Sequence, residues 1–135
     1  MAVSYLLEVD EDIVGFFCVS NDRICKGDTD KWRKIKDSVP YPKRRNSYPA
    51  VKIGRLAIDK KFQRGGFGNR MLEYIKYLFL KNNKTGCRFL LVDAYLQSVN
   101  FYSKNGFVEL SNDKSDKDTK LMYFDLNYFR PSIPS

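Results

Sequence analysis

Residues 51–72 constrain the fold of this chain most, because a hydrophobic run there leads through a glycine-rich turn into a helix. The run ends near Asp59, and its apolar members predict a buried strand: Val51, Ile53, Leu56 and Ile58. From Asn69 onward apolar residues recur at helical spacing, at Met71, Leu72, Ile75, Leu78 and Phe79. The segment therefore predicts a strand–turn–helix unit with glycines at the helix N-terminus.

The turn contains Gly65, Gly66 and Gly68. Glycine lets the chain turn sharply and lets a ligand approach the backbone, because it has no side chain. The first turn of a helix has free N–H groups and a partial positive charge, which together favour a bound phosphate. We therefore predict that this turn binds a phosphorylated cofactor; a glycine-rich turn without a ligand is the alternative.

The residues around the glycines narrow the choice of cofactor. A Walker-type loop requires Gly-Lys-Ser/Thr, whereas Gly68 is followed by Asn-Arg. A dinucleotide-binding turn requires a glycine spacing that this segment does not have. The remaining pattern, Gln63-x-x-Gly66-x-Gly68 after a hydrophobic strand, resembles the pyrophosphate-binding motif of the GCN5-related N-acetyltransferases, which bind acetyl-coenzyme A (acetyl-CoA).

A second motif follows further along the chain. Residues 89–92 predict a short buried strand that ends at Asp93 and Ala94, and residues 98–105 predict a short helix closed by Gly106. Phe-Tyr at 101–102, followed four residues later by Gly-Phe, resembles the second motif of the same family. On that match Tyr102 falls at the general-acid position and would protonate the leaving thiolate. The alternative for Tyr102 is a half-buried aromatic residue that only packs on the sheet.

The resemblance covers residues 5–126 and implies an α+β fold, with a mixed central sheet and helices on both faces. The length predicts that residues 1–135 form one domain. The resemblance also implies that acetyl-CoA is held by the strand and by the N–H groups of the turn. The implied cofactor-binding residues are Leu56, Ala57, Ile58, Gln63, Arg64, Gly65, Gly66, Phe67, Gly68, Asn69 and Arg70. Asp59 and Glu8 are candidates for a general base, although an acceptor amine that arrives neutral needs none.

The resemblance is closest to the acetyltransferases that act as toxins in bacterial toxin–antitoxin pairs. It rests on Tyr-Pro-Ala at 48–50, Ile-Gly-Arg-Leu-Ala-Ile-Asp at 53–59 and Val-Asp-Ala at 92–94. It implies that the acceptor is the α-amine of an aminoacyl-tRNA and that a cognate antitoxin is a partner. Tyr95 and Ser98 depart from the family pattern. Apolar segments 5–9 and 13–18 flank the polar turn 10–12 and predict a hairpin, and the family's opening strand and helices have no counterpart before this first hairpin. We expect that difference to expose apolar sheet surface, to favour a homodimer and to weaken activity.

Charge is distributed unevenly along the chain. Residues 1–30 hold seven acids and two bases, whereas residues 31–88 hold seventeen bases and three acids. Part of this basic excess would serve the phosphates of coenzyme A. Another part lies outside the cofactor motif, at Lys43, Arg44 and Arg45. The segment from 41 to 49 that holds them is predicted to be an extended loop. We predict that these three side chains contact RNA phosphates. A solvated basic face that aids solubility is the alternative.

Composition excludes several other classes of protein. The sequence has no histidine, which excludes the usual Cys/His zinc sites and His-based triads, and we predict no metal. No apolar run approaches the roughly 18 residues of a membrane span and no signal peptide is recognisable, so we predict a cytoplasmic protein. Two other functions remain open: N-acetylation of a small amine, peptide or protein, and a catalytically impaired remnant that binds coenzyme A or a partner.

Overall fold

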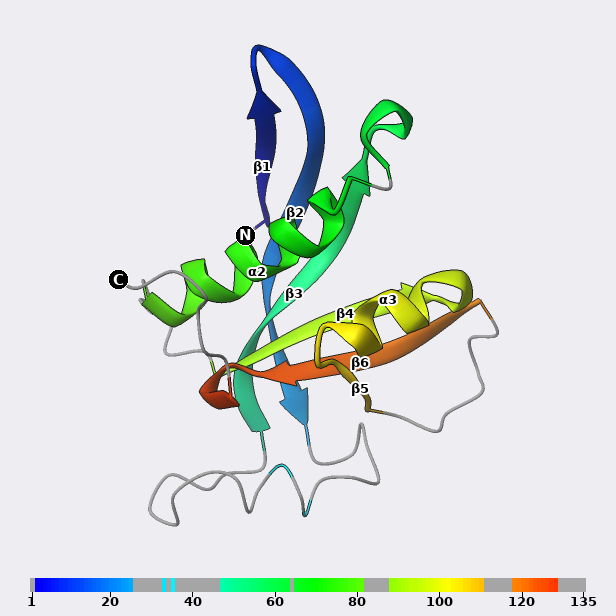
Figure 1. Cartoon of the computed structure of the whole chain (residues 1–135). Helices are drawn as coiled ribbons and strands as arrows, with labels where there is room; N and C mark the ends of the chain where they lie inside the picture. The colour runs from blue at the N-terminus through cyan, green and yellow to red at the C-terminus, as the bar shows by residue number, and fades with distance from the viewer. Residues whose placement is uncertain are drawn as a thin grey trace.

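The computed structural model describes residues 2–25, 33, 35, 47–63, 65–81, 88–110 and 118–128. These residues form a six-stranded sheet in the order β1-β2-β3-β4-β6-β5, with helices packed against it (Figure 1). The strands are β1 (Ala2–Val9), β2 (Asp12–Cys25), β3 (Ser47–Ile58), β4 (Phe89–Tyr95), β5 (Val108–Glu109) and β6 (Thr119–Asp125). The helices are α2 (Phe67–Lys81) and α3 (Val99–Lys104), with the short 3₁₀ helices η3 (Lys60–Phe62), η4 (Leu96–Ser98) and η5 (Leu126–Tyr128).

The sheet is mixed, as predicted. Strands β1, β2 and β3 are antiparallel neighbours, β3 and β4 are parallel, and β4, β6 and β5 are again antiparallel. The parallel pair requires a crossover, and α2 supplies it. The α+β fold class predicted from the sequence is thereby confirmed.

Two predicted boundaries are wrong. The strand expected to end at Asp93 continues to Tyr95, because Asp93 and Ala94 pair with Leu121 and Lys120 of β6. Residues 47–49, predicted as loop, belong to β3 and pair with β2. Pro49 is tolerated there because the pairing of β3 with β4 begins only at Ala50.

A β-bulge at Gly54 changes which side chains of β3 face each side of the sheet. Ile53 pairs with Val19 and Arg55 pairs with Cys18, so Gly54 is an extra residue in β3. Side chains alternate along a strand, and the extra residue shifts that alternation by one position. As a result Ile53 and Leu56, three residues apart, both face the same core.

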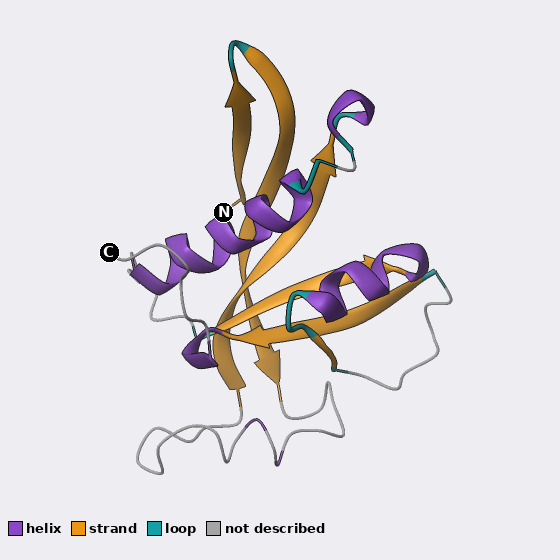
Figure 2. Ribbon diagram, viewed as in Figure 1, coloured by secondary structure: helices purple, strands orange, loops and turns teal. Residues whose placement is uncertain are grey.

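The two faces of the sheet carry separate cores. One core packs α2 and α3 against the sheet through Leu72, Ile75 and Tyr102, together with Val92 and Met122 from the strands. Figure 2 shows both helices as purple ribbons beside the orange strands. The other core contains Ile35, Phe89, Leu91, Leu110 and Tyr123 among its buried residues. Ile35 is helical and 1% exposed, so a helical residue packs on this second face as well.

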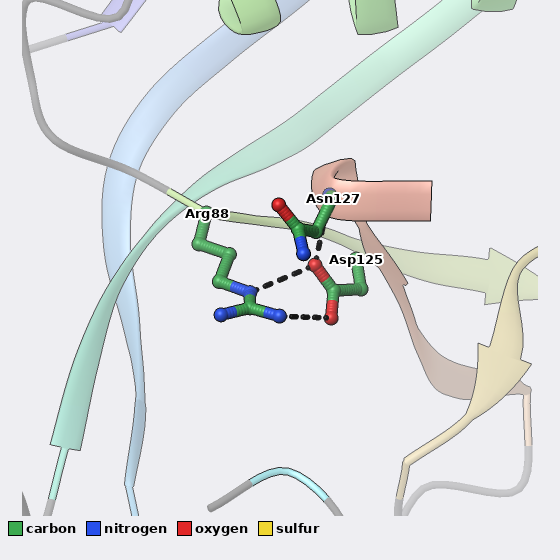
Figure 3. Close-up of polar contacts among 3 residues, drawn as sticks. All are labelled: Arg88, Asp125 and Asn127. Atoms are coloured by element: carbon green, nitrogen blue, oxygen red, sulfur yellow. Dashed lines mark hydrogen bonds and ion pairs between the residues drawn. The ribbon is translucent and has the colours of Figure 1, made fainter. Parts of the chain in front are cut away.

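An ion pair fixes the end of the sheet where β4 begins and β6 ends (Figure 3). Arg88 donates from Nε and Nη2 to the two carboxylate oxygens of Asp125, at 3.0 Å and 3.2 Å. The backbone N–H of Asn127 donates to the same carboxylate at 2.9 Å. Arg88 immediately precedes Phe89, which pairs with Asp125, so this bidentate pair holds the start of β4 against the last residue of β6. Within the described residues, no helix is long and apolar enough to cross a membrane.

Candidate active site

The two parallel strands separate partway along their length. Residues Ala50–Ile53 of β3 pair with Phe89–Val92 of β4, and the ladder between these two strands goes no further. Beyond that point β3 stays with β2 and β4 stays with β6, so the strands diverge as they do in Figure 1. A cavity of about 350 Å³ occupies the gap. Its lining residues are Phe16, Ile53, Gly54, Arg55, Leu56, Ala57, Val92, Asp93, Ala94, Tyr95, Ser98 and Tyr102.

The two faces of the sheet supply different chemistry to this cavity. Leu56 and Ala94 belong to the core beneath α2 and α3, and Tyr102 reaches the cavity from that face. Asp93 lies two residues after Leu91 of the second core, so it faces the opposite side. Phe17 and Leu56 pair with each other and face the core beneath the helices. Arg55 is the residue before Leu56, so its side chain faces the same side of the sheet as Asp93. A phenol and a carboxylate therefore approach the gap from different faces.

Tyr102 is held firmly on α3. Its side chain is 7% exposed and packs edge-to-face on Phe101 and Phe107, with ring centroids 5.1 Å and 5.4 Å away. Gly106 ends this segment with φ +89°, a left-handed conformation that only glycine adopts readily. Burial raises the pKa of the Tyr102 phenol above its ordinary value of 10.0, so the hydroxyl keeps its proton at neutral pH.

The glycine-rich turn has the geometry of an anion site at a helix N-terminus. Gly66 has φ +78°, and its carbonyl accepts the first helical hydrogen bond, from Arg70 N–H at 3.1 Å. The N–H groups of Phe67, Gly68 and Asn69 precede that bond and have no helical acceptor. They can therefore donate to a phosphate at the positive end of the helix.

The predicted cofactor-binding residues fall into three groups. Leu56 and Ala57 line the cavity, whereas Ile58 packs into the core. Phe67, Asn69, Arg70 and the glycines lie at the helix N-terminus. Arg64 lies outside the described residues. Gln63 uses its side-chain amide to donate to the Ile58 carbonyl at 3.1 Å, which fastens the turn to the end of β3.

The two candidate general bases, Asp59 and Glu8, do not line the cavity. The Asp59 carboxylate accepts the N–H of Lys61 at 2.9 Å and caps η3, and Glu8 lines a different cavity between β1 and α2. Asp93 is the one carboxylate among the described lining residues, and it forms a 2.5 Å ion pair with Lys52. Sequence reasoning missed Asp93 because its position depends on where β3 and β4 part, and no local pattern marks that point.

The predicted RNA-binding residues Lys43, Arg44 and Arg45 lie outside the described residues. The basic side chain that the structure does place at the cavity is Arg55, which is exposed. Lys52, two residues before Gly54 in β3, is the partner of Asp93 in the ion pair. The contact of this region with RNA therefore stays a prediction.

The residues present fit acetyl-CoA. The helix N-terminus offers N–H donors to a pyrophosphate. The space beside the α-carbon of Gly66 is open, because no atom beyond its chain neighbours lies within 4 Å of where a Cβ would be. The unpaired edges of β3 and β4 offer backbone groups to an extended chain entering the gap. Among the described residues no cluster that could hold a metal ion is found.

Comparison with known proteins gives a family and a set of similar structures. The model of the acetyltransferase (GNAT) domain family matches residues 2–109. No curated protein matches the chain. A structure of the KacTA–DNA complex matches with a TM-score of 0.69 and 21% identity, covering 93% of this chain and 69% of that chain. A bacterial toxin matches with a TM-score of 0.70 and 17% identity, covering 87% of this chain and 63% of that one.

A third structure, AtaT complexed with acetyl-methionyl-tRNAfMet, matches with a TM-score of 0.68 and 21% identity over 92% of this chain and 71% of that chain. The chain thus spans between 63% and 71% of the length of these three chains. At these identities the structural matches establish the fold, and the family model, which covers most of the chain, establishes the family. The expected enzyme class and acetyl donor are confirmed with it. The chain belongs to the GCN5-related N-acetyltransferases, the acetyl-CoA-dependent family that its two motifs resemble.

Proposed function

We propose that this chain transfers an acetyl group from acetyl-CoA to the α-amine of an aminoacyl-tRNA, with Tyr102 as the general acid. The observation that carries the proposal is the gap between β3 and β4, where the buried phenol of Tyr102 lines a cavity. The N-terminus of α2, whose free N–H groups suit a phosphate, supports it. Bound acetyl-CoA supplies an activated thioester. The N–H groups at the start of α2 bind its pyrophosphate, and the unpaired edge of β3 orients the arm that carries the thioester.

The protonated phenol suits the leaving-group side of the reaction. Burial raises the pKa of Tyr102, so its hydroxyl is a donor throughout the neutral range. A hydrogen bond from that hydroxyl stabilises the charge that develops on the departing sulfur, whose thiol has a pKa of roughly 8.5. The acceptor amine attacks in its neutral form, and the proton that it loses when the amide forms passes to solvent, from which the Tyr102 phenolate regains the proton that it gave to the sulfur.

Asp93 suits the acceptor side. An amine binds first as an ammonium or as a polarised neutral group, and a carboxylate is the side chain that attracts either form. Asp93 faces the side of the sheet opposite Tyr102, so an amine held there would meet the acyl group away from the leaving sulfur. The exposed guanidinium of Arg55 lines the same cavity and supplies a positive charge for a phosphate of the acceptor.

Three observations support an aminoacyl-tRNA as the acceptor. The toxin-like motifs favour it, the basic excess in residues 31–88 favours a polyanion, and the similar structure of AtaT holds acetyl-methionyl-tRNAfMet.

The same set of similar structures includes a toxin bound to the C-terminus of its antitoxin, which supports a cognate antitoxin as a partner here. Exposed apolar side chains on the first hairpin, led by Leu6 at 63% exposure and Ile13 at 54%, support a homodimer.

The test of this function is acetyl-CoA turnover measured on charged tRNA, polyamines and peptides in parallel. We expect turnover on charged tRNA and little on the others. Reversing Lys43, Arg44 and Arg45 together to Glu should weaken tRNA binding and flatten its salt dependence, while coenzyme A affinity stays unchanged. Turnover on small amines alone would replace the tRNA assignment. Coenzyme A binding without turnover on any acceptor would identify an impaired binding module.

A further inference from the structure

Asn105 lies where the helix that carries Tyr102 meets the helix that binds the pyrophosphate. It is the residue after the last turn of α3, and its backbone N–H donates to the Tyr102 carbonyl at 3.0 Å. Its side-chain amide donates to the Phe101 carbonyl at 2.9 Å and to Oδ1 of Asn69 at 3.0 Å. Asn69 stands in the first turn of α2, among the N–H groups proposed to hold the pyrophosphate. One side chain therefore joins both functional helices.

Lys76 fixes the other side of the same residue. Its ammonium, two turns along α2 from Asn69, donates to the Asn105 carbonyl oxygen. The Lys76 side chain is 7% exposed, and its nitrogen lies 4.0 Å from the ring centroid of Phe124 and 5.7 Å from that of Phe107. A buried cation costs free energy unless it is hydrogen-bonded or lies over an aromatic face, and Lys76 has both kinds of partner.

Apolar contacts join the two helices at the same place. Phe101 packs closely against Gly68: a Cβ on residue 68 would lie only 3.2 Å and 3.3 Å from two atoms of the Phe101 ring. Tyr102, the next residue, packs on both Phe101 and Phe107. A shift of the α2 N-terminus relative to α3 would therefore move Phe101 and with it the Tyr102 ring.

We propose that Asn105 is a positioning residue that makes the pyrophosphate-binding turn and the Tyr102 helix move as one unit, with Lys76 as its anchor. The inference rests on the proposed role of Tyr102, and it adds a coupling between the two sites. When coenzyme A binds the α2 N-terminus, the bridge from Asn69 through Asn105 fixes the distance from the pyrophosphate to the phenol. The length of the bound cofactor then determines where its sulfur meets Tyr102.

A double-mutant cycle tests the bridge by binding alone. Coenzyme A dissociation constants are measured by calorimetry for the unmodified chain, Asn69→Ala, Asn105→Ala and the double variant, with Ser103→Ala as the matched control on the exposed side of α3. The loss of one hydrogen bond predicts about fivefold weaker binding for Asn105→Ala. The double variant should bind no more weakly than the weaker single variant, and Ser103→Ala should match the unmodified chain. Additive effects of Asn69→Ala and Asn105→Ala would overturn the proposal.

Kinetics test the link to Tyr102. Asn105→Ala should lower kcat by about tenfold in the unmodified background, because a small misplacement of an acid is costly, and by less than about twofold when Tyr102 is already Phe. Equal losses in both backgrounds would overturn the link. If Tyr102→Phe alone turns over at the unmodified rate, the proposed acid fails while the coenzyme A cycle still decides the bridge. If Asn105→Ala does not fold, Asn105→Asp, which keeps the volume and removes the amide donor, carries both tests.

Discussion

The two ends of the β3–β4 pair differ in almost every physical respect. At the end where β4 begins, the strands are hydrogen-bonded, Phe89 and Ala50 are buried, and the Arg88–Asp125 ion pair fastens β4 to β6. At the other end the ladder stops, Tyr95 is 62% exposed, and a cavity replaces side-chain packing. The closed end provides stability, and the open end leaves backbone edges and a phenol available to a ligand. Substitutions at the two ends should therefore affect different measurements.

The largest expected effect is on chemistry at the open end. Tyr102→Phe removes the hydroxyl and keeps the ring that packs on Phe101 and Phe107, so folding and coenzyme A affinity should be unchanged. Loss of a positioned acid should slow turnover by about 10²–10⁴-fold. The measurement is the single-turnover rate at saturating acetyl-CoA. A rate equal to that of the unmodified chain would mean that Tyr102 only packs on the sheet.

The next effect is on stability at the closed end. Phe89 is fully buried between the rings of Tyr48 and Tyr123, so Phe89→Ala should lower the free energy of unfolding by about 3–5 kcal/mol. Tyr95→Ala, at the exposed end of the same strand, should change it by less than about 0.5 kcal/mol. Urea unfolding of both variants provides the comparison. Similar losses for the two would show that the open end is packed as tightly as the closed end.

A smaller difference should separate the ion pair Arg88–Asp125 from the ion pair Lys52–Asp93. Asp125 is buried, so Arg88→Met leaves a carboxylate with fewer partners and should cost about 1–3 kcal/mol of unfolding free energy. Lys52 and Asp93 are about one third and one half exposed, and Lys52→Met should cost less than about 1 kcal/mol. Thermal unfolding at low and high salt distinguishes them, because salt should weaken only the exposed pair. The reverse order of costs would contradict the division into a closed and an open end.

The smallest effect is a pH dependence where Lys76 of α2 lies over Phe124, which pairs with Leu90 of β4. Burial lowers the pKa of Lys76 from 10.5 to about 8, and Glu73 partly opposes that shift. Between pH 8 and pH 10 the unfolded chain therefore binds more protons at this residue than the folded chain, so its contribution to stability rises with pH. The gain should be about 1–2 kcal/mol. It is measured as the difference between the unmodified chain and Lys76→Met, and parallel pH profiles of the two would contradict it.

The sequence predicted the parts of the fold that depend on neighbours along the chain. The strand before Asp59, the glycine turn and the helical spacing of Leu72 and Ile75 are local patterns, and each lies where it was expected. The predicted end of β4 was wrong. Asp93 is typical of the end of a strand, but β6 supplies pairing partners for the two residues that follow it. Pairing with a neighbouring strand overrides the low strand propensity of a single residue such as Asp93.

The candidate site was predicted less completely than the fold. Tyr102 and the glycines are marked by motifs, and the structure brings Tyr102 to the cavity and the glycines to the helix N-terminus. Asp93, Lys76 and Asn105 carry no such mark, because their roles depend on which segments pack together over long sequence separations. A lysine in a helix reads as solvated, and only the tertiary structure shows that Lys76 is buried.

The bulge in β3 also sets how this sequence tolerates insertions and deletions. Strand positions before Gly54 face the core beneath α2 and α3 when their numbers are odd, as Ile53 does, and positions after it do so when their numbers are even, as Leu56 does. Deleting Gly54 would remove the extra residue and leave Ile53 and Leu56 on the same face, because plain alternation then relates them. Deleting Lys52 would instead turn Val51 to the opposite face, although no residue type had changed. Adding or removing one residue between Asp59 and Gly65 would leave that facing intact. Length variants of this chain should therefore survive in the turn before α2 and at Gly54, and fail in the regular part of β3 before the bulge.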